Sequence, residues 1–162
     1  MKASSIRSYT LDDVKKQASR LIAEGADNPY VRQLASVAVA EAPHDDAGGQ
    51  FVAVHEFVRR TFPYQPDAFG KEVFIAPARV AEDYILLSKV YSLDCDCMAL
   101  LTAAMLRTIG YRTRFVALAI HGDEFDHAIS QVYGDGEWIS IDASSKYPTG
   151  WAEQYRKMVT IE

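Results

Sequence analysis

The sequence predicts an α+β fold in which helices occupy the first two thirds of the chain and strands follow. Apolar residues recur at helical spacing in several segments before residue 63, and residues 94–109 are apolar around nearly the whole of a helix. After Gly110, three runs rich in aromatic and β-branched residues are separated by turn sequences. Runs of helices followed by runs of strands are typical of α+β domains.

The first predicted helix begins near residue 11 and ends at Gly25. Thr10 and Asp13 are spaced as a capping pair at its start. The apolar residues at helical spacing along it are Leu11, Val14, Ala18, Leu21 and Ile22. A second helix is predicted from Asn28 and Pro29 to Glu41, because a capping side chain followed by proline is a helix-start signal.

A third helix is predicted over residues 51–62, ending before Pro63. The next segment, 63–91, has three prolines and no clean period, and we expect an ordered connection with a short helix near 80–89. Residues 94–109 then predict a helix buried on all sides, because very few of its positions are polar.

Three strands are predicted in the last third of the chain, at residues 112–120, 125–133 and 137–143. The sequence Gly134-Asp135-Gly136 is a strong hairpin signal between the last two. We expect one domain over residues 1–162, with a helical layer (1–50), a catalytic core (51–143) and a surface tail (144–162).

Charge and composition exclude several classes of protein. The net charge of -5 and the lack of a basic block argue against a nucleic-acid binder or a protein that binds anionic membranes. No signal peptide is visible, and the longest near-apolar run, residues 97–106, is too short to span a bilayer. The only cysteines, Cys95 and Cys97, are too close for a disulfide framework, which predicts a reducing, cytoplasmic location.

Three residues suggest an activated thiol. Cys95 opens the buried helix, whose N-terminus supplies partial positive charge, and His127 and Asp142 lie on strands that a hairpin makes neighbours. A nearby imidazolium and the helix end are both expected to lower the thiol pKa, while the carboxylate orients the imidazole. Backbone N–H groups at the helix start can also stabilise an oxyanion.

Several motifs together resemble the transglutaminase-like (papain-like cysteine) superfamily. They are the segment 94–116 opened by Asp94 and Cys95, the pair His127-Ala128, and the spacing Trp138-x-x-x-Asp142. Upstream, segment 62–67 resembles the approach segment of phage-encoded members. The resemblance covers residues 51–143 and implies a papain-like fold, with a helical layer and a central cysteine-bearing helix packed on an antiparallel sheet.

The resemblance implies that Cys95 is the nucleophile, His127 the base and acid, and Asp142 the orienting carboxylate. Tyr64 and Trp138 are candidate substrate-binding residues, although packing in the core is an equal alternative for Trp138. Two other residues are expected to have structural roles only. Cys97 is expected in the core, and His55 is expected to be packed and hydrogen-bonded. A redox role is the alternative for Cys97, and the lack of a second ligand pair argues against zinc.

The predicted function is thiol-dependent acyl transfer on an amide or peptide through a thioester, with hydrolysis favoured over transfer to an amine. A peptide or protein amide is the expected partner, and no cofactor is required. One alternative is a true protein-crosslinking transglutaminase. Another is a structural or assembly protein, such as a phage virion component, that docks through its N-terminal helices.

Overall fold

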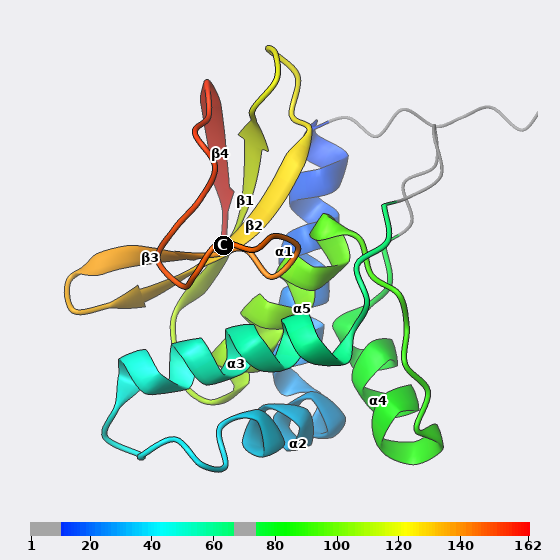
Figure 1. Ribbon diagram of the computed structural model, residues 1–162. Coiled ribbons are helices and arrows are strands. Elements are labelled where there is room, and N and C mark those ends of the chain that lie inside the picture. The colour runs from blue at the N-terminus through cyan, green and yellow to red at the C-terminus, as the bar shows by residue number, and fades with distance from the viewer. Residues whose placement is uncertain (1–10, 67–73) are drawn as a thin grey trace, which may run out of the picture.

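The computed structural model describes residues 11–66 and 74–162, in which five helices precede a four-stranded antiparallel sheet (Figure 1). The helices are α1 (Leu11–Asp27), α2 (Pro29–Ala38), α3 (Ala47–Thr61), α4 (Pro77–Leu87) and α5 (Cys95–Thr108). The strands are β1 (Thr113–Ala119), β2 (His127–Gly134), β3 (Glu137–Ile141) and β4 (Lys157–Ile161). The predicted α+β class is therefore confirmed.

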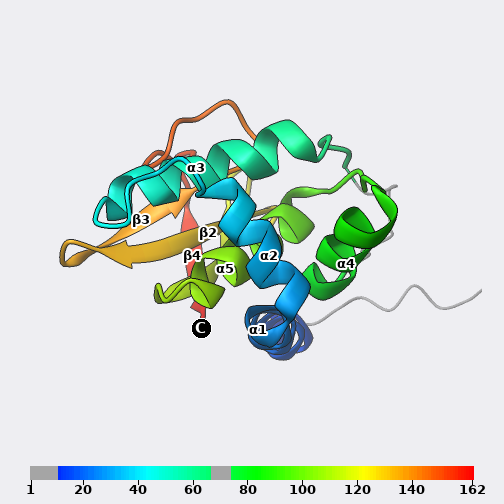
Figure 2. The same ribbon diagram turned by 90° about the horizontal axis from the view of Figure 1, so that it is seen from below.

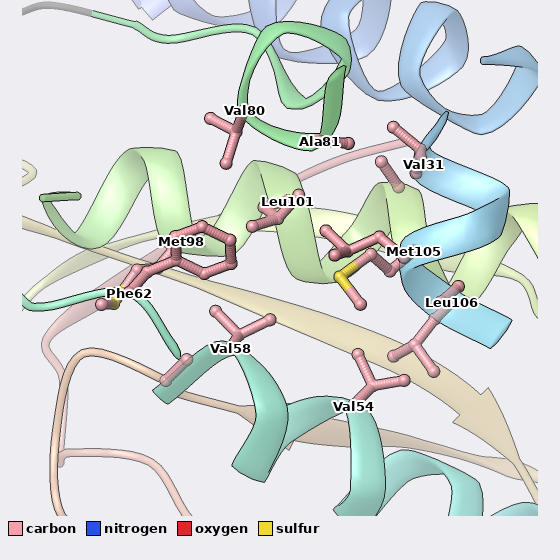
Figure 3. Packing of buried hydrophobic residues seen from close by; sticks show 14 of the residues in the cluster. Val31, Val54, Val58, Phe62, Val80, Ala81, Met98, Leu101, Met105 and Leu106 are labelled. Atoms are coloured by element: carbon pink, nitrogen blue, oxygen red, sulfur yellow. The ribbon is translucent and has the colours of Figure 1, made fainter. Parts of the chain in front are cut away.

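Helix α5 is the centre of the molecule, as its apolar sequence predicts. Every residue from 97 to 106 is buried. One side of α5 faces the sheet and the others face α1 to α4, and Figures 2 and 3 show this helix enclosed by its neighbours. Leu101 and Met105 pack against Val58 of α3 and Val80 of α4 in the larger hydrophobic cluster. The helix that begins at Cys95 is thereby packed between the sheet and the other helices.

Helix caps follow the predicted signals in part. The Asn28 side chain accepts hydrogen bonds from the N–H groups of Tyr30 and Val31, which confirms the start of α2, although this helix ends at Ala38 and not at Glu41. Gly25 does not end α1, which continues to Asp27. The predicted capping pair includes Thr10, which lies outside the described residues.

The sheet has the strand order β3-β2-β1-β4. Asp135 and Gly136 both have positive φ angles, 51° and 83°, so the predicted hairpin turn between β2 and β3 is confirmed. Strand β4 was not predicted, because residues 144–162 were expected to be only a surface tail. It pairs with β1, more than 35 residues earlier in the chain, and such a non-local partner leaves no turn signal nearby.

The connection before α5 contains the predicted short helix, α4, and a short stretch of parallel pairing. Tyr64 and Leu93 form a β-bridge, in which the Gln65 N–H donates to the Leu93 carbonyl and the Leu93 N–H donates to the Pro63 carbonyl. This pairing places Tyr64 beside the residues that open α5. Among the described helices, none is both long and apolar enough to cross a bilayer.

Candidate functional site

Cys95 is the first residue of α5, and its position is set by the cap of that helix. The Asp94 carboxylate accepts a hydrogen bond from the Cys97 N–H at 2.9 Å, the ordinary geometry of an aspartate N-cap. Cys95 is partly exposed and lines a cavity of about 350 Å³ together with His127. Cys95 and His127 therefore border a common space.

His127 and Asp142 are in direct contact, as the hairpin predicts. The imidazole Nε2 lies 2.7 Å from Asp142 Oδ2, at the point where β2 begins and β3 has just ended. The other carboxylate oxygen accepts hydrogen bonds from the Ser144 N–H at 3.1 Å and the Ser144 hydroxyl at 2.6 Å. Because Nε2 is engaged by the carboxylate, Nδ1 is the nitrogen left to exchange a proton with a reacting group.

The His127–Asp142 pair favours the charged form of both partners. Burial lowers the pKa of His127, but the hydrogen bond and negative charge of Asp142, with Asp126 and Asp96, outweigh it, and the pKa lies above 6.5. Burial raises the pKa of Asp142, but its hydrogen bonds to His127 and Ser144 hold this pKa below its ordinary value. The carboxylate is therefore ionised and orients the imidazole.

The environment of Cys95 corrects one expectation from the sequence. A helix N-terminus was expected to lower the thiol pKa, yet burial first, and then the charges of Asp96, Asp94 and Asp142, raise it above its ordinary value. The backbone N–H of Ala128 acts in the opposite direction. Together these effects favour the protonated thiol.

Tyr64 lies near this centre and Trp138 does not. Tyr64 is half exposed and lines a second cavity of about 320 Å³ together with His127 and Asp142. Burial, followed by the charges of Cys95 and neighbouring carboxylates, raises the pKa of its hydroxyl. Trp138 is the second residue of β3, about 13 Å from Asp142 at the usual strand rise. The guanidinium of Arg114 lies over its ring, 3.9 Å from the ring centre.

Cys97 is a core residue, as expected. Its side chain is 2% exposed, and its sulfur accepts a hydrogen bond from the Ile75 N–H at 3.3 Å, which ties the connection before α4 to α5. Burial raises the pKa of this thiol as well. Among residues 11–66 and 74–162, no group of three or more His, Cys, Asp or Glu side chains is arranged to hold a metal ion.

Two contacts to Asp142 were not predicted from the sequence. Ser144 was not singled out, although an aspartate followed two residues later by serine is a local pattern in which the carboxylate accepts from the backbone. His55 was expected only to be packed and hydrogen-bonded, which is confirmed, but one of its partners is the main-chain carbonyl of Asp142. No sequence signal connects α3 with this residue, 87 positions later.

Comparison with solved structures shows the same fold. LapG of Legionella pneumophila is 15% identical with a TM-score of 0.54, over 86% of this chain and 74% of that one. A proposed cysteine protease of Cytophaga hutchinsonii is 15% identical with a TM-score of 0.51, over 86% of this chain and 54% of that one. A proposed protease of Parabacteroides distasonis is 13% identical with a TM-score of 0.55, over 83% of this chain and 27% of that one.

The chain thus spans about half of the length of the Cytophaga protein and about a quarter of the length of the Parabacteroides protein. No curated protein matches the sequence. The family model of the transglutaminase-like superfamily matches residues 32–143, which includes α3, the whole of α5 and the residues Cys95, His127 and Asp142. Since this match covers more than half of the sequence, the chain belongs to the transglutaminase-like superfamily.

Proposed function

We propose that this protein catalyses thiol-dependent acyl transfer on an amide or peptide, with hydrolysis as the outcome. One observation carries the proposal: His127, held by Asp142 through a 2.7 Å hydrogen bond, lines the same cavity as Cys95. Structural neighbours described as proteases and as a transglutaminase support thiol chemistry in general. In this scheme Cys95 is the nucleophile, His127 the base and acid, and Asp142 the orienting carboxylate.

The reaction begins with transfer of the thiol proton. In its neutral form, His127 accepts the proton of Cys95 at Nδ1 as the sulfur attacks the carbonyl carbon of the substrate. The negative charge that forms on the carbonyl oxygen is stabilised by backbone N–H groups in the first turn of α5. The carbon–nitrogen bond then breaks, the leaving amine takes the proton from His127, and a thioester on Cys95 remains.

Water completes the cycle in the proposed hydrolysis. His127 removes a proton from water, the hydroxyl oxygen attacks the thioester, and the carbon–sulfur bond breaks to release a carboxylic acid. The sulfur recovers its proton from His127, so that the enzyme returns to its starting state. Water needs no binding site of its own, which makes hydrolysis simpler than transfer to an amine.

Trapping the thioester tests this proposal. The protein is mixed with a panel of p-nitrophenyl esters and peptide amides, quenched in acid, and its intact mass is measured. We expect a single acyl group on Cys95 in the unmodified sequence and in the Cys97→Ala variant, and none in Cys95→Ala. Equal acylation of Cys95→Ala would contradict the proposal.

A second experiment determines whether water or an amine accepts the acyl group. A fluorescent primary amine is added at millimolar concentration, and the free acid and the fluorescent amide are quantified by chromatography. We expect the acid as the main product. Predominant formation of the amide would leave the thiol mechanism in place and would assign a transglutaminase reaction.

A further inference from the structure

His55 on α3 is a buried titratable residue that the scheme above does not use. Its side chain has no solvent exposure. Nε2 lies 3.1 Å from the main-chain carbonyl oxygen of Asp142, and Nδ1 lies 2.7 Å from the Thr149 hydroxyl. A carbonyl oxygen only accepts, so Nε2 carries the proton, and Nδ1 accepts from Thr149.

The two partners of His55 are the two ends of one loop. We call residues 142–149 the acid loop, because it begins with Asp142. Beyond its far end, the Gly150 N–H donates to the Ser140 carbonyl of β3 at 2.7 Å, so the chain returns to the strand it left. Figure 2 shows the orange segment that follows β3 running alongside α3.

A second residue of α3 binds the middle of the acid loop. Arg59 Nη1 donates to the carbonyl oxygens of Ser145 and Tyr147, each at 3.3 Å. Arg59 and His55 are four residues apart and therefore lie on one face of the helix. Helix α3 is thus bonded to the start, the middle and the end of the loop.

Inside the loop, few contacts fix the Asp142 main chain. The Ser144 bonds hold its carboxylate, and the Ser145 hydroxyl reaches its carbonyl oxygen at 3.4 Å, which is close to the limit of a hydrogen bond. The bond from His55 is shorter and comes from a rigid helix. His55 therefore reaches the Asp142 main chain without lining either of the two cavities described above.

We propose that His55 is a positioning residue that pins both ends of the acid loop to α3 and so keeps the Asp142 carboxylate on His127. The inference rests on the proposed function, because only there does the His127–Asp142 contact serve a reaction. Groups that orient the partner of a reacting side chain commonly decide how well that side chain is placed.

The test measures the imidazole pKa of His127 by NMR titration in a Cys95→Ala background. The variant His55→Leu removes both hydrogen bonds at similar volume. We expect the pKa of His127 to fall toward 6.5, because Asp142 no longer holds the imidazolium. With Cys95 restored, we expect kcat to fall about tenfold or more with little change in KM, the pattern of a misplaced acid–base group.

Two further variants distinguish positioning from general stability. His55→Gln retains a donor where Nε2 lies, so we expect it to restore most of the His127 pKa and of kcat. Ile22→Ala in α1 destabilises the fold through a second hydrophobic cluster, formed by α1, α5 and the sheet, and we expect no change in the His127 pKa. An unchanged His127 pKa in His55→Leu, or an equal fall in Ile22→Ala, would overturn the inference.

If His55→Leu does not fold, Thr149→Val takes its place. That variant removes only the hydroxyl at the far end of the acid loop, and the same downward shift of the His127 pKa is expected; no shift overturns the inference. The titration needs no turnover. A failure to trap the thioester in the unmodified protein would therefore reject the proposed function without deciding the role of His55.

Discussion

At the scale of single residues, burial and negative charge around Cys95 act in the same direction. Both favour the protonated thiol, and the Asp142 contact favours the protonated imidazole. In the proposed mechanism a thiolate–imidazolium pair is therefore not the resting state, and His127 has to lose its own proton before it can accept one from Cys95. The identities of Cys95, His127 and Asp142 came from the sequence, whereas this protonation state required the surrounding carboxylates and the burial.

The first prediction concerns the pH dependence of acylation. We expect kcat/KM to rise with pH along a limb whose pKa lies above 6.5, because His127 must be neutral to act as a base. In Asp142→Asn, the limb should move toward lower pH and kcat should fall by about 10²-fold. The measurement is the rate of p-nitrophenol release from an ester between pH 4 and 10. A limb below pH 5 would instead indicate a resting thiolate.

The second prediction concerns the charge of the cavity that Cys95 lines. Its described walls include Asp96, Glu124 and Asp126. We expect a trimethylammonium-ethyl methanethiosulfonate to modify Cys95 about tenfold or more faster than the anionic sulfonatoethyl reagent, since a negative cleft concentrates cations. Mass spectrometry follows the modification, and Cys95→Ala gives the background from Cys97, which is 2% exposed.

The matched variant for this labelling experiment is Asp96→Asn, which removes one charge next to the thiol. The ratio of the two labelling rates should decrease in this variant, and it should also decrease in 0.5 M salt because exposed charges are screened. Equal rates for both reagents at low salt would show that the carboxylates do not set the field at Cys95.

At the scale of elements, the helices and three of the strands follow from local patterns, whereas the contacts between helices do not. Gly25 shows the difference. From the sequence it predicted the end of α1, but a Cβ atom at this position would lie 2.9 Å from the Ala104 Cβ of α5 and 3.0 Å from the Pro77 Cβ of α4. The absence of a side chain lets three helices approach closely, a property of packing that no helix signal encodes.

The third prediction compares two helical glycines. Alanine normally stabilises an exposed helix position by up to about 1 kcal/mol relative to glycine. We expect this gain for Gly48→Ala in α3, where the nearest atom to an added Cβ is 3.8 Å away. For Gly25→Ala we expect a loss of about 1–3 kcal/mol, because the added methyl overpacks the contact with Ala104. Urea denaturation measures both, and a stabilised Gly25→Ala would contradict the packing.

At the scale of the whole molecule, α5 joins two hydrophobic clusters into one fold. One cluster brings α2, α3, α4 and part of β2 and β3 onto α5, and the other brings α1, β1, β4 and the start of β2 onto it. Helix α1 also contacts the chain end, since the Ser19 hydroxyl donates to the Glu162 carbonyl at 2.9 Å. The N-terminal helices are therefore part of the same core as the candidate site, and the acid loop is bonded to that core through α3.

The fourth prediction concerns the pH dependence of global stability. Burial, and then the charge of Arg59, lowers the pKa of His55 below 6.5. Between the lowered pKa of the folded state and the ordinary value of 6.5 in the unfolded state, only the unfolded protein binds a proton at His55. His55 therefore makes the free energy of unfolding decrease as the pH falls below 6.5. The slope for one proton is at most about 1.4 kcal/mol per pH unit.

His127 acts in the opposite direction because its pKa is raised, so the comparison has to be made between variants. We expect His55→Gln to lose less stability than the unmodified protein between pH 6.5 and 5. His44→Gln serves as the control, because His44 is exposed in the segment before α3. Urea denaturation at several pH values measures these differences, and an identical pH dependence of His55→Gln and the unmodified protein would contradict the prediction.

The sequence by itself determined the α+β class, the order of the helices and the burial of α5, and it proposed Cys95, His127 and Asp142 as the candidate site. The class, the helix order and the burial depend on local periodicity, caps and turns, whereas the three candidate residues rest on residue type and on motifs shared with a family. The tertiary structure alone decided the pairing of β4 with β1, the close approach at Gly25, the raised thiol pKa and the bonds from His55 to the acid loop. Each of these depends on groups far apart in the chain, whose distance and burial are set only when the layers pack together.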